Sequence, residues 1–174
     1  MDQNSSYKNV LRFPIQFAEG CVVEEISSEV LSTSAGLELR ALSKRCFQQD
    51  LVLRNQANYR HFVLTSEQAG VLGFTSLLNM PQGKRANYWL SNVCIDPRVQ
   101  GRGLGRKLVK AVFVAANECR GKAFGGNALE WEGGMCYLAT SGAETFFARC
   151  GFAVCDKRKL VPHGELTVMA KPLI

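Results

Sequence analysis

Apolar and polar positions follow two different periods along the chain, and the switches between them mark the expected elements. Alternation, or a short apolar run bounded by turn residues, predicts a strand, whereas apolar residues three and four apart predict a helix. We expect strands at 21–26, 59–65, 71–78, 87–95, 135–140, 154–161 and 165–171. We expect helices at 35–46, 103–120 and 142–150, a short helix or a loop at 48–58, and a long loop at 121–134.

The order of these elements predicts a mixed sheet. Strand 87–95 feeds helix 103–120, which leads to strand 135–140, and such a crossover makes the two strands parallel. The remaining strands follow one another through short turns and should pair antiparallel. The pattern therefore predicts an α/β (α+β) fold with a mostly antiparallel sheet of six to seven strands, one parallel pair and about four flanking helices.

Composition limits the class of protein. The 174 residues are 47% hydrophobic and 21% charged, which suits one globular domain with a single core. No apolar run reaches 18 residues and the polar start lacks the pattern of an export signal, so we expect a soluble, cytoplasmic protein without a membrane partner. The seven cysteines are widely spaced without a CxxC pair, which predicts reduced thiols and no metal site.

The formal net charge of +6 admits nucleic acid, an acidic membrane or an anionic cofactor as partner. The largest basic cluster, 98–110, lies on a glycine-rich stretch, and no long Lys/Arg run or aromatic–basic repeat occurs. This distribution favours a phosphorylated cofactor, and we expect no nucleic-acid partner.

The glycine-rich stretch joins an expected strand to an expected helix. Gly101, Gly103 and Gly105 allow backbone N–H groups to converge at the helix start, where the helix dipole favours an anion. Arg102 and Arg106 add positive charge. The spacing excludes the dinucleotide motif GxGxxG and a Walker A loop, and it indicates a pyrophosphate cradle.

Two segments carry a family resemblance. Gln100-x-x-Gly103-x-Gly105 after Ile95-x-Pro97, and Ala143-x-x-Phe146-Phe147-x-x-x-Gly151-Phe152, resemble the GCN5-related N-acetyltransferase (GNAT) superfamily. The resemblance extends from about residue 21 to 172. It implies the GNAT fold with a splayed parallel pair, acetyl-CoA as cofactor, and one acetyltransferase domain over 1–174 with 1–14 as a flexible N-terminal segment.

The resemblance also implies the cofactor-binding residues. Backbone of Val93 and Ile95 would meet the pantetheine arm, and Thr140, Phe146 and Phe147 would form its far wall. The pyrophosphate would be held by Gln100, Gly101, Arg102, Gly103, Leu104, Gly105 and Arg106.

The catalytic residues are less well marked. Many family members use a Tyr acid at the position of Phe147, and the strand 87–92 lacks the Glu that some relatives use as base. We therefore predict Tyr88 and Tyr137 as catalytic residues, with a strand aromatic in the core as the equal alternative for Tyr88. Other candidates for a base or substrate contact are Glu130, Glu132, His61 and His163.

The implied activity is acetyl transfer from acetyl-CoA to a primary amine by direct attack in a ternary complex. The amine could belong to a protein or peptide N-terminus or to a small molecule. Segment 77–82 is similar to N-terminal acetyltransferases of acidic actin N-termini, for which Arg60, Lys84 and Arg85 would meet acidic residues; segment 137–141 is equally similar to members acting on amino acids. The alternatives are a non-catalytic acyl-CoA-binding module and a nucleic-acid binder. We expect a monomer or a homodimer.

Overall fold

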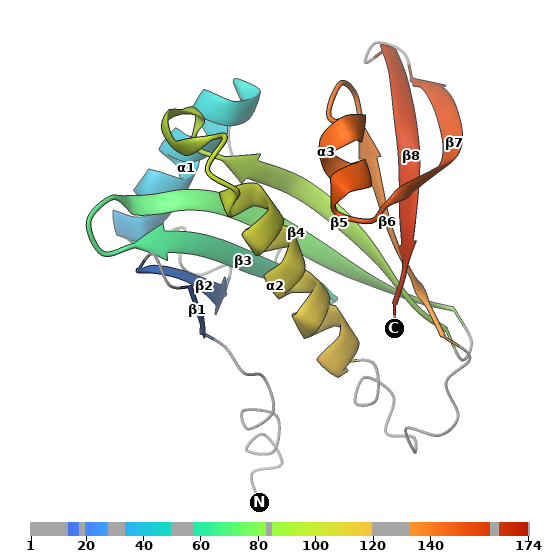
Figure 1. Ribbon diagram of the computed structural model, residues 1–174, viewed down its shortest axis with the longest axis horizontal. Coiled ribbons are helices and arrows are strands. Elements are labelled where there is room, and N and C mark those ends of the chain that lie inside the picture. The colour runs from blue at the N-terminus through green and yellow to red at the C-terminus, as the bar shows by residue number, and fades with distance from the viewer. Residues whose placement is uncertain are drawn as a thin grey trace, which may run out of the picture.

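The computed structural model describes residues 14–17, 20–27, 34–49, 58–82, 85–119, 133–160 and 164–173. Within these ranges the chain forms one eight-stranded sheet with helices on both faces (Figure 1). The strands are β1 (Ile15–Gln16), β2 (Cys21–Ile26), β3 (Tyr59–Ser66), β4 (Gly70–Gln82), β5 (Arg85–Ile95), β6 (Met135–Thr140), β7 (Ala153–Leu160) and β8 (Gly164–Pro172). The helices are α1 (Ser34–Phe47), the short 3₁₀ helix η2 (Pro97–Val99), α2 (Leu104–Cys119) and α3 (Glu144–Arg149).

The sequence pattern predicted these elements closely. Every expected strand is present, and the largest difference is in β4, which continues to Gln82. The described part of the chain has one strand more than the six to seven expected, because the two-residue β1 joins the edge of β2, and it has three α-helices. The undecided segment 48–58 and the loop 121–134 lie mainly outside the described residues.

The sheet order is β1-β2-β3-β4-β5-β6-β8-β7. The β5–β6 pair is parallel and every other described pair is antiparallel, so the predicted mixed topology is confirmed. The crossover between the parallel strands contains α2, which therefore starts beside the end of β5.

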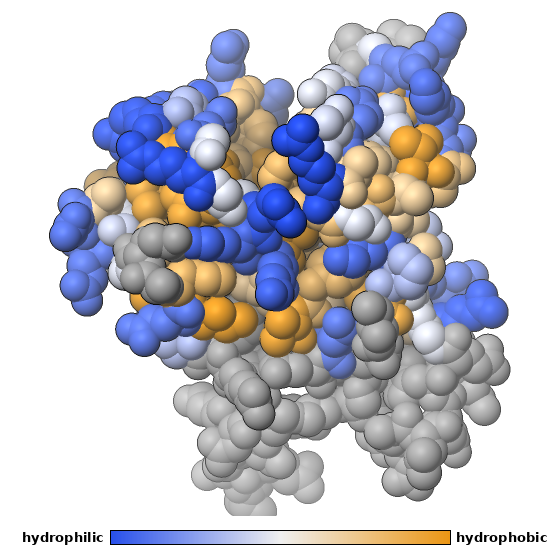
Figure 2. Space-filling model, viewed as in Figure 1, coloured by the Kyte–Doolittle hydropathy of each residue, from blue (hydrophilic) through white to orange (hydrophobic). Residues whose placement is uncertain are grey.

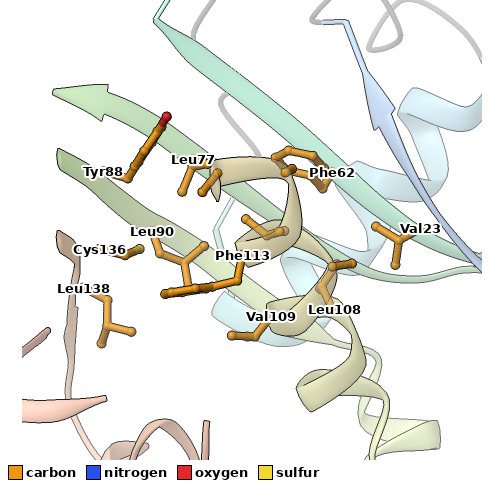
Figure 3. Packing of buried hydrophobic residues seen from close by; sticks show 14 of the residues in the cluster. Val23, Phe62, Leu77, Tyr88, Leu90, Leu108, Val109, Phe113, Cys136 and Leu138 are labelled. Carbon is orange, nitrogen blue, oxygen red and sulfur yellow. The ribbon is translucent and has the colours of Figure 1, made fainter. Parts of the chain in front are cut away.

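Helices α1 and α2 cover opposite faces of the sheet. Successive side chains of a strand point to opposite faces, and in β3 Phe62 and Leu64 pack in the cluster of α2 while Val63 packs with α1. Figure 3 shows the α2 side, where Leu108 and Val109 meet strand residues. No helix in the described ranges is long and apolar enough to cross a bilayer.

A β-bulge in β5 changes which side chains face α2. Phe74 pairs with Cys94 but Ser76 pairs with Ser91, so two residues of β5 lie opposite one of β4. Asn92, within the bulge, has a φ of +54°. The extra residue shifts the alternation by one place, so Leu90 and then Val93 contact the α2 cluster while Cys94 packs with α1.

Candidate active site

The parallel strands are joined over a short length only. β5 and β6 pair at two positions, Tyr88 with Cys136 and Trp89 with Tyr137. Beyond this pair the strands separate, as Figure 1 shows, with the start of α2 and α3 flanking the open end. The edge of β5 from Leu90 onward is therefore unpaired with β6, and an unpaired strand edge presents backbone donors and acceptors to an extended ligand.

The closed end of this V depends on a close backbone approach. A Cβ on Gly134 would overlap the carbonyl oxygen of Ala86, so only glycine fits there. The Asn87 Oδ1 accepts a hydrogen bond from the Met135 N–H at 3.2 Å, and the Leu173 N–H donates to the Gly134 carbonyl at 3.0 Å. These contacts hold β6 against β5 just before the strands diverge.

The glycine-rich loop lies at the open end of the V. Gly101 and Gly103 have φ angles of +81° and +78°, which side chains rarely adopt, and a Cβ on either would meet nothing within 4 Å. The backbone here faces open space. At the first turn of α2, a Cβ on Gly105 would lie 3.1 Å from the Phe146 ring, so α2 starts against α3.

Positive charge surrounds this loop. Arg102 and Arg106 are exposed, and the N-terminus of α2 adds unpaired N–H groups and its dipole. Figure 2 shows strongly hydrophilic side chains gathered over the start of α2 and the adjoining loop. The loop therefore has the conformation, open approach and charge that a pyrophosphate requires.

A buried carboxylate fixes the base of the loop. The side chain of Asp96 is 0% exposed and accepts from the Arg98 N–H and Nε at 3.0 Å each, and from the Arg98 Nη2 at 2.7 Å. The Arg45 Nη2 of α1 donates to it at 2.8 Å. Hydrogen bonds from Arg98, then from Arg45, hold the pKa of Asp96 well below its usual range despite burial.

Gln100 and Ile95, two of the residues predicted to bind the cofactor, are hydrogen-bonded to each other. The Gln100 Nε2 donates to the Ile95 carbonyl oxygen at 3.0 Å, and the Cys46 thiol donates to the same oxygen at 3.4 Å. Gln100 thus ties the loop to the end of β5. Val93, next to the bulge, lies on the unpaired part of β5, and its side chain packs against the α2 cluster.

The predicted far wall lies across the V from β5. Thr140 ends β6 and is 8% exposed, Phe147 is buried in the α2 cluster, and Phe146 is partly buried beside Gly105. The two phenyl rings meet edge to face, with centroids 4.9 Å apart. The structure thus brings the predicted wall residues together on one side of the V.

A cavity of about 500 Å³ opens on the face of the sheet opposite α2. It is lined by strands on both sides of the parallel pair, through Met80, Gln82, Asn87, Trp89, Tyr137, Cys155, Asp156, Arg158 and Val168. Trp89 and Tyr137 form the last parallel pair before the strands separate. The cavity therefore reaches the point from which the V opens.

The two predicted catalytic tyrosines occupy different environments. Tyr137 lines the cavity and is partly exposed. Tyr88 is 2% exposed in the α2 cluster, where Figure 3 shows its ring beside Leu77 and Leu90. Alternation of β5 explains the difference, because Tyr88 and Trp89 point to opposite faces.

Sequence reasoning missed most of the cavity lining. Asn87 and Trp89 could have been found from the alternation, since Ala86, Tyr88 and Leu90 form the apolar face toward α2. Asp156 and Arg158 gave no such signal, because their strand is distant from the loop in sequence.

The remaining sequence candidates are placed away from the cavity or are not described. The buried His61 ring lies 2.8 Å from the Ser76 Oγ, and Arg60 forms a two-point ion pair with Glu25, at 2.7 Å for each bond. The candidates that lie outside the described residues are Lys84, Glu130, Glu132 and His163.

Comparison with known families identifies the fold. The family model described as an acetyltransferase (GNAT) domain matches residues 57–154, which is more than half of the chain and spans both strands of the V, the loop and α3. The chain belongs to the GNAT family. This GNAT protein is accordingly an acetyltransferase with acetyl-CoA as its cosubstrate, and the predicted fold, family and cosubstrate are confirmed. No curated protein matches the chain in sequence.

Solved structures with this fold include enzymes with different acceptors. The ribosomal-protein-S18-alanine N-acetyltransferase of Escherichia coli is 18% identical, with a TM-score of 0.63 over 88% of this chain and 94% of that chain. Naa50 of Arabidopsis thaliana, bound to the bisubstrate analogue CoA-Ac-MVNAL, is 13% identical, with a TM-score of 0.62 over 87% and 98%. Spermidine N-acetyltransferase of Vibrio cholerae, bound to CoA and spermine, is 14% identical, with a TM-score of 0.62 over 89% and 96%. At these identities the likeness concerns the fold.

Proposed function

We propose that this GNAT protein transfers an acetyl group from acetyl-CoA to a primary amine by direct attack in a ternary complex. One observation carries the proposal: the V opens at the Trp89–Tyr137 pair, and the same two side chains line the cavity on the other face. Two ligands that enter from opposite sides would meet there. Both substrates can then be bound together, as direct attack requires.

The loop and the open strand edge would bind the acetyl-CoA. The backbone N–H groups of 101–105, with Arg102 and Arg106, suit the pyrophosphate. The unpaired edge of β5 near Val93 suits the arm, with Thr140 and Phe146 opposite. When bound, acetyl-CoA supplies the activated thioester.

The chain's own groups suit the remaining tasks. The bulge at Asn92–Val93 interrupts the regular β4–β5 register, and a backbone N–H that it leaves out of the ladder would suit the carbonyl oxygen that gains charge in the transition state. Tyr137 lines the cavity beside the reaction point, and its phenol is suited to pass a proton between the amine and the leaving thiolate.

A matched pair of glycine variants tests cofactor binding. Gly103→Val adds side-chain bulk to the loop, whereas Gly164→Val adds it at the β7–β8 turn, where φ is +76° and a Cβ would likewise meet nothing within 4 Å. The two variants share the backbone strain and differ in location. In the wild type, acetyl-CoA at a hundred times its dissociation constant stabilises by about 2.7 kcal/mol, which raises the unfolding midpoint by about 5 to 10 °C.

We expect the midpoint shift with acetyl-CoA to disappear in Gly103→Val and to persist in Gly164→Val. The wild type should release CoA in the presence of an amine, with initial rates that give intersecting double-reciprocal plots. A full shift in Gly103→Val would contradict the binding site. Parallel plots, which indicate an acetyl-enzyme, would contradict direct attack.

A further inference from the structure

The cavity has a charged rim on β7, at its far side from the V. Asp156 pairs with Val168 and Arg158 with Leu166 across the β7–β8 ladder, so Asp156 and Arg158 share the face of Val168. All three line or border the cavity, and Lys157 and Lys159 point to the other face. One carboxylate and one guanidinium are therefore presented to an acceptor.

The two charges of the rim differ in how fully they are bonded. Both oxygens of Asp156 are occupied, Oδ1 by the Lys157 N–H at 2.8 Å and Oδ2 by the Arg158 Nε at 2.8 Å. Arg158 donates to Asp156 through its Nε alone, and the two Nη groups of Arg158 have no partner among the described residues. The guanidinium thus keeps the two-point donor edge that matches a carboxylate.

The rest of the lining does not supply that carboxylate. Asp156 is the single acidic side chain of the lining, and the amides of Asn87 and Gln82 face each other, with Nδ2 3.4 Å from Oε1. The floor is Met80, Trp89, Tyr137 and Val168, which suits apolar parts of an acceptor. The Nη groups of Arg158 are therefore suited to bind an anionic group of the acceptor.

The sheet geometry sets the separation between this cation and the reaction point. β7 is two strands from β6, about 10 Å away, and Arg158 is four residues along the ladder from Tyr137, about 13 Å. The two long side chains close part of this distance. About 10 Å remains, the length of three extended residues.

We propose that Arg158 determines acceptor specificity by binding a carboxylate two or three residues from the reacting amine. The acceptor is then a peptide N-terminus with an acidic side chain at its second or third position. This inference rests on the proposed function, because it assumes that the amine reacts beside Trp89 and Tyr137. An α-amino acid, whose amine and carboxylate share one carbon, does not span the distance.

Matched peptides and variants test the inference. We would measure CoA release with short peptides that differ at the third position, Asp, Asn or Lys, for the wild type, Arg158→Ala, Arg158→Glu and the control Lys159→Ala. Lys159→Ala removes the same charge from the opposite face of the same strand. The retained midpoint shift with acetyl-CoA checks that each variant is folded.

We expect the wild type to prefer the Asp peptide over the Asn peptide by about fivefold in kcat/KM, since the ion pair is solvent-exposed. The preference should fall with added salt, vanish in Arg158→Ala, turn toward the Lys peptide in Arg158→Glu and persist in Lys159→Ala. Turnover without a preference for the Asp peptide, or an equal loss of that preference in Lys159→Ala, would overturn this inference and leave the proposed function standing. Absence of turnover with every amine would overturn the proposed function and the inference with it.

Discussion

Asp96 joins three parts of the site at the scale of a single residue. Its fully buried carboxylate binds Arg98 of η2 and Arg45 of α1, and its own N–H donates to the Leu72 carbonyl of β4 at 2.8 Å. A buried carboxylate is costly unless such donors surround it. The arrangement holds the end of β5 in the position from which the loop begins.

Replacement of Asp96 by Asn should therefore destabilise the protein. The added NH₂ would face the donors of Arg98 and Arg45, and the loss of charged hydrogen bonds should lower the free energy of unfolding at pH 7 by about 2 kcal/mol. Asp156→Asn is a comparable control, because Asp156 also accepts from the Nε of an arginine two residues on and from a backbone N–H, that of Lys157, but at an exposed site. Urea denaturation of both variants measures the difference, and equal losses would contradict the role of burial.

The ion pairs of Asp96 with Arg98 and Arg45 should also make the stability of the protein depend on pH. The folded-state pKa of Asp96 lies below its ordinary value, so its contribution is fully present above about pH 4 and is lost as the pH falls through the folded-state pKa. The stability gap between wild type and Asp96→Asn should thus narrow below about pH 4. A gap that widens in acid would show that Asp96 is not the ionised partner.

Tyr88 and Tyr137 provide a second test at this scale. Tyr137→Phe should lower kcat at least tenfold with little change in acetyl-CoA affinity, because a positioned proton donor contributes about a hundredfold or more. Tyr88→Phe removes a hydroxyl from the other face of the sheet and should change kcat less, although its role stays a prediction. Initial rates at saturating acetyl-CoA compare the two, and a larger loss in Tyr88→Phe would reverse the assignment.

At the scale of elements, β5 organises the site through two local features. Its bulge changes the alternation between Leu90 and Val93, and its first residues hold β6 at the closed end of the V. The strand therefore contributes the core face, the cavity face and the open edge in one run of residues 85–95.

Gly134→Ala should disturb that closed end. Because its Cβ would overlap the Ala86 carbonyl oxygen, the backbones must move apart, at a cost of about 2 kcal/mol in the free energy of unfolding. Gly133→Ala, where φ is +89° and a Cβ would meet nothing within 4 Å, is the neighbouring control for backbone strain. Hydrogen exchange of the β6 amides should accelerate in Gly134→Ala and not in Gly133→Ala. Unchanged exchange would show that the contact does not hold the strands together.

At the scale of the whole molecule, the sheet separates two binding regions that meet at the Trp89–Tyr137 pair. The cationic loop and α2 lie on one side, and the cavity with its β7 rim lies on the other. In this interpretation, cationic side chains lie on both sides of the sheet. Arg102 and Arg106 would bind the pyrophosphate on one side, and Arg158 would bind a carboxylate on the other, in a chain with a net charge of +6.

Local patterns were enough to predict the elements, the loop and the family. Helical and strand periods are properties of neighbouring residues, and so are the glycine positions with φ angles of +81° and +78° that leave the loop backbone open. The parallel pair followed from element order alone. These features depend on short stretches of neighbouring residues and on the order of the elements, so the sequence by itself determined them.

Only the tertiary structure decided which side chains meet. Alternation separates Tyr88 from Trp89, but only the strand pairings place Tyr137 and Arg158 on the side of the sheet that Trp89 faces. The Gln100 side chain binds the Ile95 carbonyl, a contact that no spacing rule predicts. A one-residue shift in register would reverse each face, and register is set by contacts between residues far apart in the sequence.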